Sequence, residues 1–171
     1  MSKAFTSEET PDPGPVLRAP PRLAPGEVRY VTPEGYARLR DALAQLLARR
    51  PALLREEGAD RAARLAELDA RAAVIEGTLA VLTVLGPEAA PEGVVAFGSW
   101  VTVLDAAGAR TTWRIVGPDE AEPREGRLGV GAPVARALLG RREGDVVEVE
   151  RPGGVRELTV VRVTRTASDS R

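Results

Sequence analysis

The chain has 171 residues, a formal net charge of −1 and 29% charged residues, a balance typical of globular proteins rather than disordered ones. This near-neutral charge argues against holding nucleic acid by bulk electrostatics. The absence of cysteine and histidine excludes disulfides, Cys/His zinc sites, thiol nucleophiles and histidine-based triads. Any catalysis would have to use carboxylates, Arg, Ser, Thr or Tyr.

The N-terminal segment, residues 1–27, is rich in proline. Proline removes backbone donors and disfavours helix in the residue before it, so we expect an extended, disordered tail here. The first residues lack the pattern of a secretory signal, and no apolar run reaches the roughly 20 residues that a membrane span needs. We therefore expect a cytoplasmic protein that does not enter membranes. The prolines are Pro11, Pro13, Pro15, Pro20, Pro21 and Pro25.

Residues 28–86 have the spacing of an antiparallel helical hairpin. Thr32 is a suitable N-cap, Pro33 suits the first helical position, and Gly58 separates two helices. Apolar residues recur at alternating steps of three and four, as in the seam of a coiled coil, and predict a rod of roughly 35–40 Å. Pro51 should kink the first helix. The predicted seam residues are Tyr36, Leu39, Leu43, Leu46, Arg50 and Leu53, then Leu65, Leu68, Ala72, Ile75, Leu79 and Leu82.

From Gly93 the period changes to two, which indicates a small β-rich domain over residues 93–164. Strands are expected at 94–97, 100–104 and 111–116, and a hairpin pairs 146–150 with 156–163. A short helix is predicted at 133–139, and residues 165–171 should fray. The predicted fold class is therefore α+β, with an N-terminal helical hairpin followed by a β-rich domain that has one short helix. Trp100 and Trp113 fall on strands and are expected in its core.

Several segments resemble the family of Gre transcript cleavage factors. The C-terminal domain of that family is similar to 115–117, 120–122, 133–140, 144–145 and 152–154, and its first strand to 97–101. The sequences Thr-Pro-Glu-Gly-Tyr at 32–36 and Arg-Arg-Pro at 49–51 are similar to the start of the family's coiled coil. Residues 1–6 are similar to the opening of the GreB-like branch. This resemblance covers 28–164 and implies an FKBP-like fold for the C-terminal domain.

The resemblance also implies a function. Members of the family insert their coiled coil into the secondary channel of RNA polymerase, where acidic tip residues help to hold the catalytic metal and water. The polymerase then cleaves its own transcript. The chain would act as a monomer on core RNA polymerase, with no active site or cofactor of its own, and would share the Mg²⁺ ion of the polymerase. The polymerase-binding residues would be Gly131, Ala132, Pro133, Glu120 and Glu122.

Two departures from the family pattern change this expectation. The segment between Pro51 and Leu82 is shorter than in the family by about two heptads, which removes roughly 10 Å of rod. The chain has no asparagine, so the family's Gly-Asp…Glu-Asn tip is absent. In the docking loop, Gly131 and Ala132 replace an Asp or Asn and a Ser. We therefore expect an elongation modulator that binds the polymerase without stimulating cleavage efficiently.

Alternatives remain open at this point. Glu56, Glu57 and Asp60 at the tip are either substitute metal ligands or a helix cap with solvated charges. The rod arginines contact transcript RNA or the channel wall, or they form a solvated face. The alternative functions are a cleavage-stimulating factor with a relocated acidic tip, a short-rod polymerase binder similar to the regulator Rnk, and a scaffold for another partner. The rod arginines named above are Arg38, Arg40, Arg49, Arg55, Arg61, Arg64 and Arg71.

Overall fold

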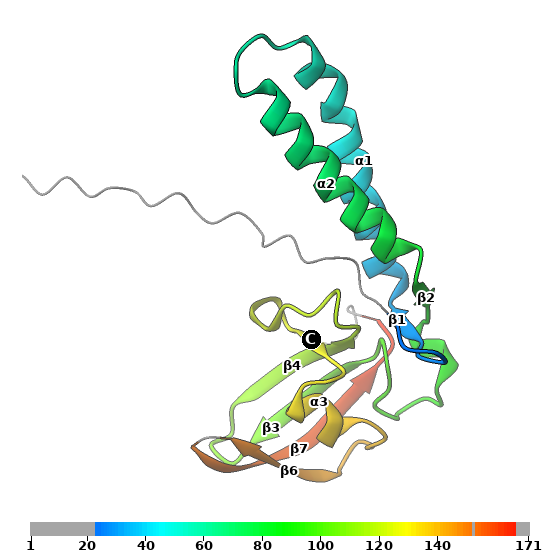
Figure 1. The fold of residues 1–171 in the computed structure, drawn as a ribbon. Coiled ribbons are helices and arrows are strands. Elements are labelled where there is room, and N and C mark those ends of the chain that lie inside the picture. Colours follow the sequence, from blue (N-terminus) through cyan, green and yellow to red (C-terminus); the bar gives the residue numbers. More distant parts are fainter. Residues whose placement is uncertain (1–22, 152, 167–171) are drawn as a thin grey trace, which may run out of the picture.

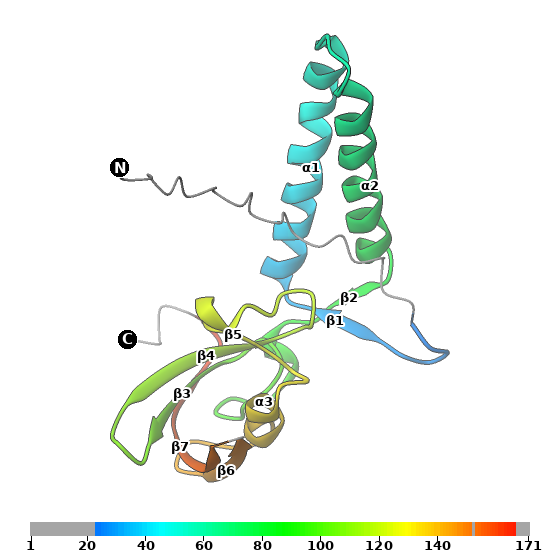
Figure 2. The same ribbon diagram turned by 60° about the vertical axis from the view of Figure 1, so that its left-hand side comes forward.

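The computed structural model describes residues 23–151 and 153–166, which form a helical hairpin standing on a curled β-sheet (Figure 1). Figure 2 shows from a second side that the hairpin points away from the sheet. The predicted Pro-rich tail lies outside the described residues up to position 22, and so do residues 167–171 of the predicted C-terminal tail. The two hairpin helices and the five-stranded sheet thus occupy separate parts of the molecule, in agreement with the predicted α+β class.

The hairpin consists of α1 (Pro33–Arg55) and α2 (Arg61–Leu79). The Thr32 side chain caps α1 by accepting a hydrogen bond from the Gly35 backbone N–H at 3.0 Å. Gly58, with φ of 137°, lies in the connection between the helices. The two helices lie side by side and antiparallel in both views. At about 1.5 Å per residue, the 23 residues of α1 give a rod of roughly 35 Å.

Burial follows the predicted seam. All the predicted seam residues within the two helices are partly or fully buried except Arg50, and Leu68 and Ala72 are only 6% and 5% exposed. Arg50 instead donates two hydrogen bonds across the hairpin to the Asp69 carboxylate, at 2.8 and 3.0 Å. The α1 helix continues through Pro51, which is exposed. The spacing of three and four thus identified the packed face of each helix.

The predicted end of the second helix was wrong. Helix α2 ends at Leu79, and β2 (Leu82–Val84) pairs in parallel with β1 (Arg29–Val31), a strand that the sequence analysis missed. Leu82 therefore belongs to a strand and not to the helical seam. Residues 81–85 are Val-Leu-Thr-Val-Leu, rich in β-branched side chains, and β1 offers them a partner. The small parallel sheet joins the two ends of the hairpin at its base.

The second sheet has five strands in the order β5-β4-β3-β7-β6. The strands β3 (Trp100–Asp105), β4 (Arg110–Val116), β6 (Val146–Arg151) and β7 (Gly154–Thr164) are paired antiparallel, and β5 (Arg127–Gly129) runs parallel to β4. The register between β3 and β7 shifts at Thr102/Val103, which marks a bulge. Bulges increase local twist, and the sheet curls around α3 (Pro133–Leu138).

The hydrophobic core lies between this sheet and α3. It contains Val95, Val101, Val103, Ile115, Leu128, Val134, Ala135, Leu138, Val147, Val149, Leu158 and Val160. Trp113 packs against this core, as predicted, whereas Trp100 is partly buried beneath the Arg114 guanidinium at 5.7 Å. The strand predicted at 94–97 is not formed, since this segment has only an isolated bridge from Val94 to Arg142. The short strand β5 and the 3₁₀ turns η1 (Pro87–Ala89) and η2 (Pro123–Glu125) were not predicted.

Candidate functional site

The predicted acidic tip lies at the far end of the hairpin, where Glu56, Glu57 and Asp60 are all exposed. The Glu56 carboxylate forms an ion pair with Arg64, and the Glu56 carbonyl accepts a hydrogen bond from Arg61 Nη1 at 3.3 Å. Asp60 occupies the N-cap position of α2, but its side chain makes no capping hydrogen bond. The structure thus brings the three residues to one end of the molecule with different local roles.

A metal site is not assembled at this tip. Within residues 23–151 and 153–166, no group of three or more acidic side chains converges closely enough to hold a metal ion. Carboxylate ligands have to sit within a few tenths of an ångström of ideal distances before they bind a metal tightly. By itself, the tip presents separate charges rather than a preformed ligand set.

The predicted docking loop lies at the start of α3. Gly131 and Pro133 are exposed and Ala132 is partly buried at the N-cap position, where no side chain accepts a hydrogen bond from the helix. This is the consequence expected of alanine in place of a serine cap, which costs about 1 kcal/mol. Glu122 is also partly buried. Four of the five predicted contact residues therefore remain accessible to a partner.

Glu120 is the exception. Its side chain is only 1% exposed, and its carboxylate accepts hydrogen bonds from the Thr32 backbone N–H at 2.8 Å and the Thr32 hydroxyl at 2.5 Å. It also accepts a hydrogen bond from the Gly117 N–H at 3.3 Å and pairs with Arg38 at 3.4 Å. A buried carboxylate with these partners joins the hairpin to the β-rich part. Its burial argues against the predicted role of Glu120 as a surface contact.

Two further ion pairs at this joint were missed by the sequence analysis. Arg29 of β1 donates to both oxygens of Asp119, at 2.6 and 2.9 Å, and this hydrogen bonding raises the pKa of Arg29 above its ordinary value. Arg114 of β4 donates to Glu34 in the first turn of α1 at 2.6 Å. Burial acts to raise the pKa of Glu34, but the hydrogen bond and charge of Arg114 together with hydrogen bonds from its own backbone and from Thr32 outweigh burial, so the net change is a lower pKa. A signal was present in the sequence: glycine at position 35 is unfavourable in a helix and indicates close approach of another segment.

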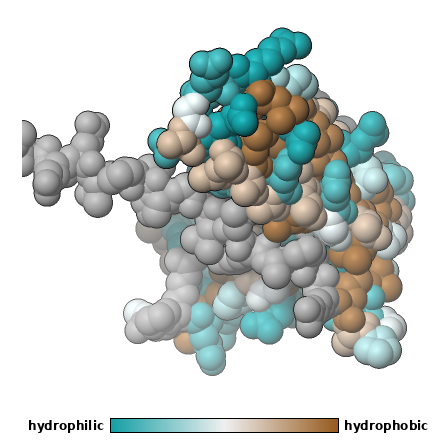
Figure 3. All heavy atoms as spheres, turned by 45° about the horizontal axis from the view of Figure 1, so that its top comes forward, coloured by the Kyte–Doolittle hydropathy of each residue, from teal (hydrophilic) through white to brown (hydrophobic). Residues whose placement is uncertain are grey.

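The arginines of the rod have mixed environments. Arg64 and Arg71 pair with Glu56 and Glu67, and Arg38 reaches Glu120. Arg40, Arg49 and Arg55 are exposed and have no ion-pair partner among the described residues. Viewed from the tip end, apolar side chains lie between charged ones over the hairpin (Figure 3), and Leu47 and Leu54 are its most exposed large apolar residues. The hairpin surface thus combines exposed arginines with exposed leucines.

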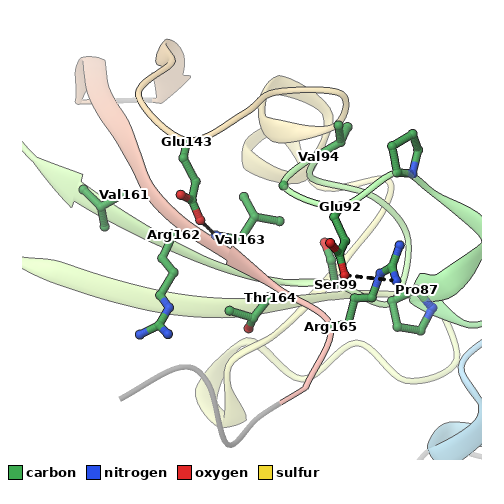
Figure 4. A pocket seen from close by; sticks show the side chains of 12 residues that line it. Pro87, Glu92, Val94, Ser99, Glu143, Val161, Arg162, Val163, Thr164 and Arg165 are labelled. Atoms are coloured by element: carbon green, nitrogen blue, oxygen red, sulfur yellow. Dashed lines mark hydrogen bonds and ion pairs between the residues drawn. The ribbon is translucent and has the colours of Figure 1, made fainter.

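An open groove of about 700 Å³ runs along the end of β7, lined by residues 161–165 on one side and 91–94 on the other. Figure 4 shows Glu143 reaching over β7, where its carboxylate accepts a hydrogen bond from the Val163 N–H at 2.8 Å. Glu92 and Arg165 form an exposed ion pair at 3.5 Å. The hydroxyl of Ser99, which also lines the groove, is engaged with the backbone of Ala96. These polar groups of the groove are therefore already hydrogen-bonded or ion-paired within the protein.

Comparison with known proteins identifies relatives of both parts of the chain. Residues 90–165 match the family described as "Transcription elongation factor, GreA/GreB, C-term". The transcription elongation factor GreB of Pseudomonas aeruginosa is 36% identical over 159 positions, which cover 84% of this chain and 94% of that protein. The chain belongs to the GreA/GreB family of transcription elongation factors.

Two further matches complete this comparison. The transcription elongation factor GreA of Neisseria meningitidis serogroup A is 42% identical over 98 residues, 56% of this chain and 62% of that protein. The chain thus matches about three fifths of the length of this GreA relative. The solved structure of GreA factor homolog 1 (Gfh1) from Thermus thermophilus is 26% identical over 81% of this chain and 99% of that one, with a TM-score of 0.38. In the described part of the chain, no helix is both long and apolar enough to cross a membrane.

Proposed function

We propose that this protein is a Gre-type modulator of transcription elongation. It binds core RNA polymerase as a monomer and places a shortened hairpin in or near the secondary channel, without stimulating transcript cleavage efficiently. The observation that carries this proposal is the match to a GreB over 94% of that protein's length, which spans the hairpin as well as the β-rich part. In this proposal the hairpin is a coiled coil and the β-rich part has an FKBP-like fold.

The length of the alignment supports a shortened hairpin. It runs over 159 positions, but 84% of this 171-residue chain is only about 144 residues. About 15 aligned positions of the relative therefore have no counterpart here. If they are divided between the two arms of the hairpin, each arm is shorter by roughly 10 Å at 1.5 Å per residue. Carboxylates that end this far from a metal act on it only through a screened, long-range field.

The arrangement of the tip supports the same conclusion. Glu56 is paired with Arg64, and Asp60 stands at the start of α2, so the acidic residues do not face a common point. In our proposal the chain contributes no active site or cofactor of its own, and the Mg²⁺ ion belongs to the polymerase. Obstruction of the channel by the hairpin would then account for an effect on elongation.

Docking is assigned to the loop before α3. Gly131 and Pro133 are exposed on the β-rich part and lie outside its hydrophobic core, so they can contact a partner without disturbing that core. Ala132, between them, is partly buried at the N-cap position of α3. We propose that Gly131, Ala132, Pro133 and Glu122 contact the polymerase.

The test is RNA release from a stalled, backtracked polymerase complex. The wild-type protein should bind the complex, release little RNA and compete with a full-length cleavage factor. The amount of RNA released should not change in the triple variant Glu56→Ala/Glu57→Ala/Asp60→Ala. Release at the level of a full-length factor, lost in the triple variant, would instead establish the tip as a contributor to cleavage. If the wild-type protein does not bind core polymerase, the whole proposal is wrong.

A further inference from the structure

The hairpin is attached to the β-rich part through very few residues. β1 ends at Val31 and α1 begins at Pro33, so Thr32 alone connects them. The return from α2 passes through two residues into β2, which pairs only with β1 in the described chain. The base of the hairpin is thus a two-stranded sheet whose position depends on what holds β1 and Thr32.

One carboxylate makes several of the contacts in that attachment. Glu120 lies beside the N-terminus of α1 and accepts from both the backbone N–H and the hydroxyl of Thr32, its N-cap residue. The same hydroxyl accepts from the Gly35 N–H, so the carboxylate and the first turn of the helix form one hydrogen-bonded chain. The N-terminus of a helix carries partial positive charge and stabilises a nearby anion. A buried carboxylate that lost these donors would be left uncompensated.

Two glycines make room for this contact. A Cβ atom at Gly35 would overlap the carboxyl group of Glu120, and one at Gly117 would overlap the Tyr30 carbonyl oxygen. Neither glycine has a positive φ, so neither is required by an unusual backbone conformation. Each is needed because two segments approach more closely than any side chain allows. The joint is therefore packed as well as hydrogen-bonded.

Flanking ion pairs hold the joint at separate points. Arg29 clamps Asp119 beside β1, and Arg114 links β4 to Glu34 on the first turn of α1. Arg114 is itself held by the Gly98 carbonyl at 3.2 Å and lies over the Trp100 ring. Because these contacts lie on different sides of Thr32, they resist rotation of the hairpin relative to the β-rich part in more than one direction.

We propose that Glu120 is a positioning residue that fixes the direction of the hairpin relative to the β-rich part. Because the tip lies roughly 35 Å from the joint, a rotation of about 10° there displaces the tip by roughly 6 Å. Resting on the proposed function, this means that Glu120 decides where the tip arrives once the β-rich part has docked. Its effect would be exerted through Thr32 and α1, with no contact to the polymerase.

The test measures the distance between the tip and the sheet in the isolated full-length protein. The chain has no cysteine, so Ala59→Cys at the tip and Ala107→Cys in the β3–β4 turn, both exposed, can carry the only two nitroxide labels. Pulsed electron paramagnetic resonance should give one narrow distance distribution. In Glu120→Ala the distribution should shift or become about twice as wide, because a small angular freedom is magnified along the rod. Glu148→Ala, which removes an exposed carboxylate of β6, should leave it unchanged.

A second pair of variants protects the test against simple misfolding. Thr32→Ser keeps the hydroxyl and should retain the narrow distribution, whereas Thr32→Val removes it and should broaden the distribution. Circular dichroism and tryptophan emission of each variant establish that helices and sheet are still folded. An unchanged narrow distribution in both Glu120→Ala and Thr32→Val would overturn the inference. Because no polymerase is present, this outcome is independent of whether the proposed function holds.

Discussion

The folding stability of the hairpin should depend on Leu68 more than on any exposed residue of α2. Leu68 is 6% exposed, and within α2 only Ala72 and Thr78 are also buried. Leu68→Asp removes about 2–3 kcal/mol of side-chain burial and places a carboxylate where no partner was present. Burying that charge, or protonating it, costs a few kcal/mol more. A two-helix rod with so few buried residues should then lose its packing, because isolated helices of this length are marginal.

Two spectroscopic signals separate the parts of the molecule. α1 and α2 hold 23 and 19 helical residues against six in α3, so circular dichroism at 222 nm reports mainly on the hairpin. Both tryptophans, Trp100 and Trp113, lie on β3 and β4, so their emission reports on the β-rich part. We expect Leu68→Asp to lose more than half of the helical signal while tryptophan emission remains native.

The matched control is Ala66→Asp, which introduces the same charge two residues away on an exposed position. It should lower stability by only about 0.5 kcal/mol through helix propensity. An unchanged helical signal and melting temperature in Leu68→Asp would refute the packing argument. Loss of both signals together would show that hairpin and sheet unfold as one unit.

Three further predictions concern other parts of the chain. Gly117→Ala should lower the melting temperature and loosen the joint because its Cβ meets the Tyr30 carbonyl, whereas Gly131→Ala, which has open space, should be neutral in thermal melts. Backbone hydrogen bonds from Ala109 and Ala107 and the Arg156 pair lower the pKa of Asp105. The stability that the Asp105 carboxylate contributes is complete above its unfolded pKa near 4 and is lost as the pH falls through the lower folded pKa. Asp105→Asn should therefore lower the melting temperature at neutral pH and lower it progressively less below about pH 4. Pro133→Asp should weaken binding to core polymerase at least several-fold in a titration. If this variant bound as tightly as the surface control Pro91→Asp, the docking assignment would be contradicted.

Local pattern was sufficient for the elements whose stability comes from neighbours in sequence. Thr32 caps α1 as predicted, because a hydroxyl three residues before a free N–H needs no tertiary help. The seam positions from Leu39 to Leu79, apart from the exposed Arg50, were found because their spacing matches the turn of a helix. The β6–β7 hairpin likewise follows from alternation on either side of a Gly-containing turn.

The tip shows where this reasoning reaches its limit. Spacing correctly put Glu56 and Asp60 at the end of the hairpin, yet it could not show that Glu56 would turn toward Arg64 or that Asp60 would leave α2 without a side-chain cap. Rotamers of exposed side chains depend on neighbours from both helices, which a linear pattern does not define.

By itself, the sequence determined the two helices, the main strands and the family resemblance. Only the tertiary structure decided which element Leu82 belongs to and whether Glu120 is exposed. Leu82 continues a helical period but pairs with Arg29, far away in the chain, and becomes part of a strand. The family resemblance predicted Glu120 to be a polymerase-binding residue, but it is buried against Thr32, 88 residues earlier. In both cases the deciding partner is distant in sequence, and periodicity describes only what residues do to their near neighbours.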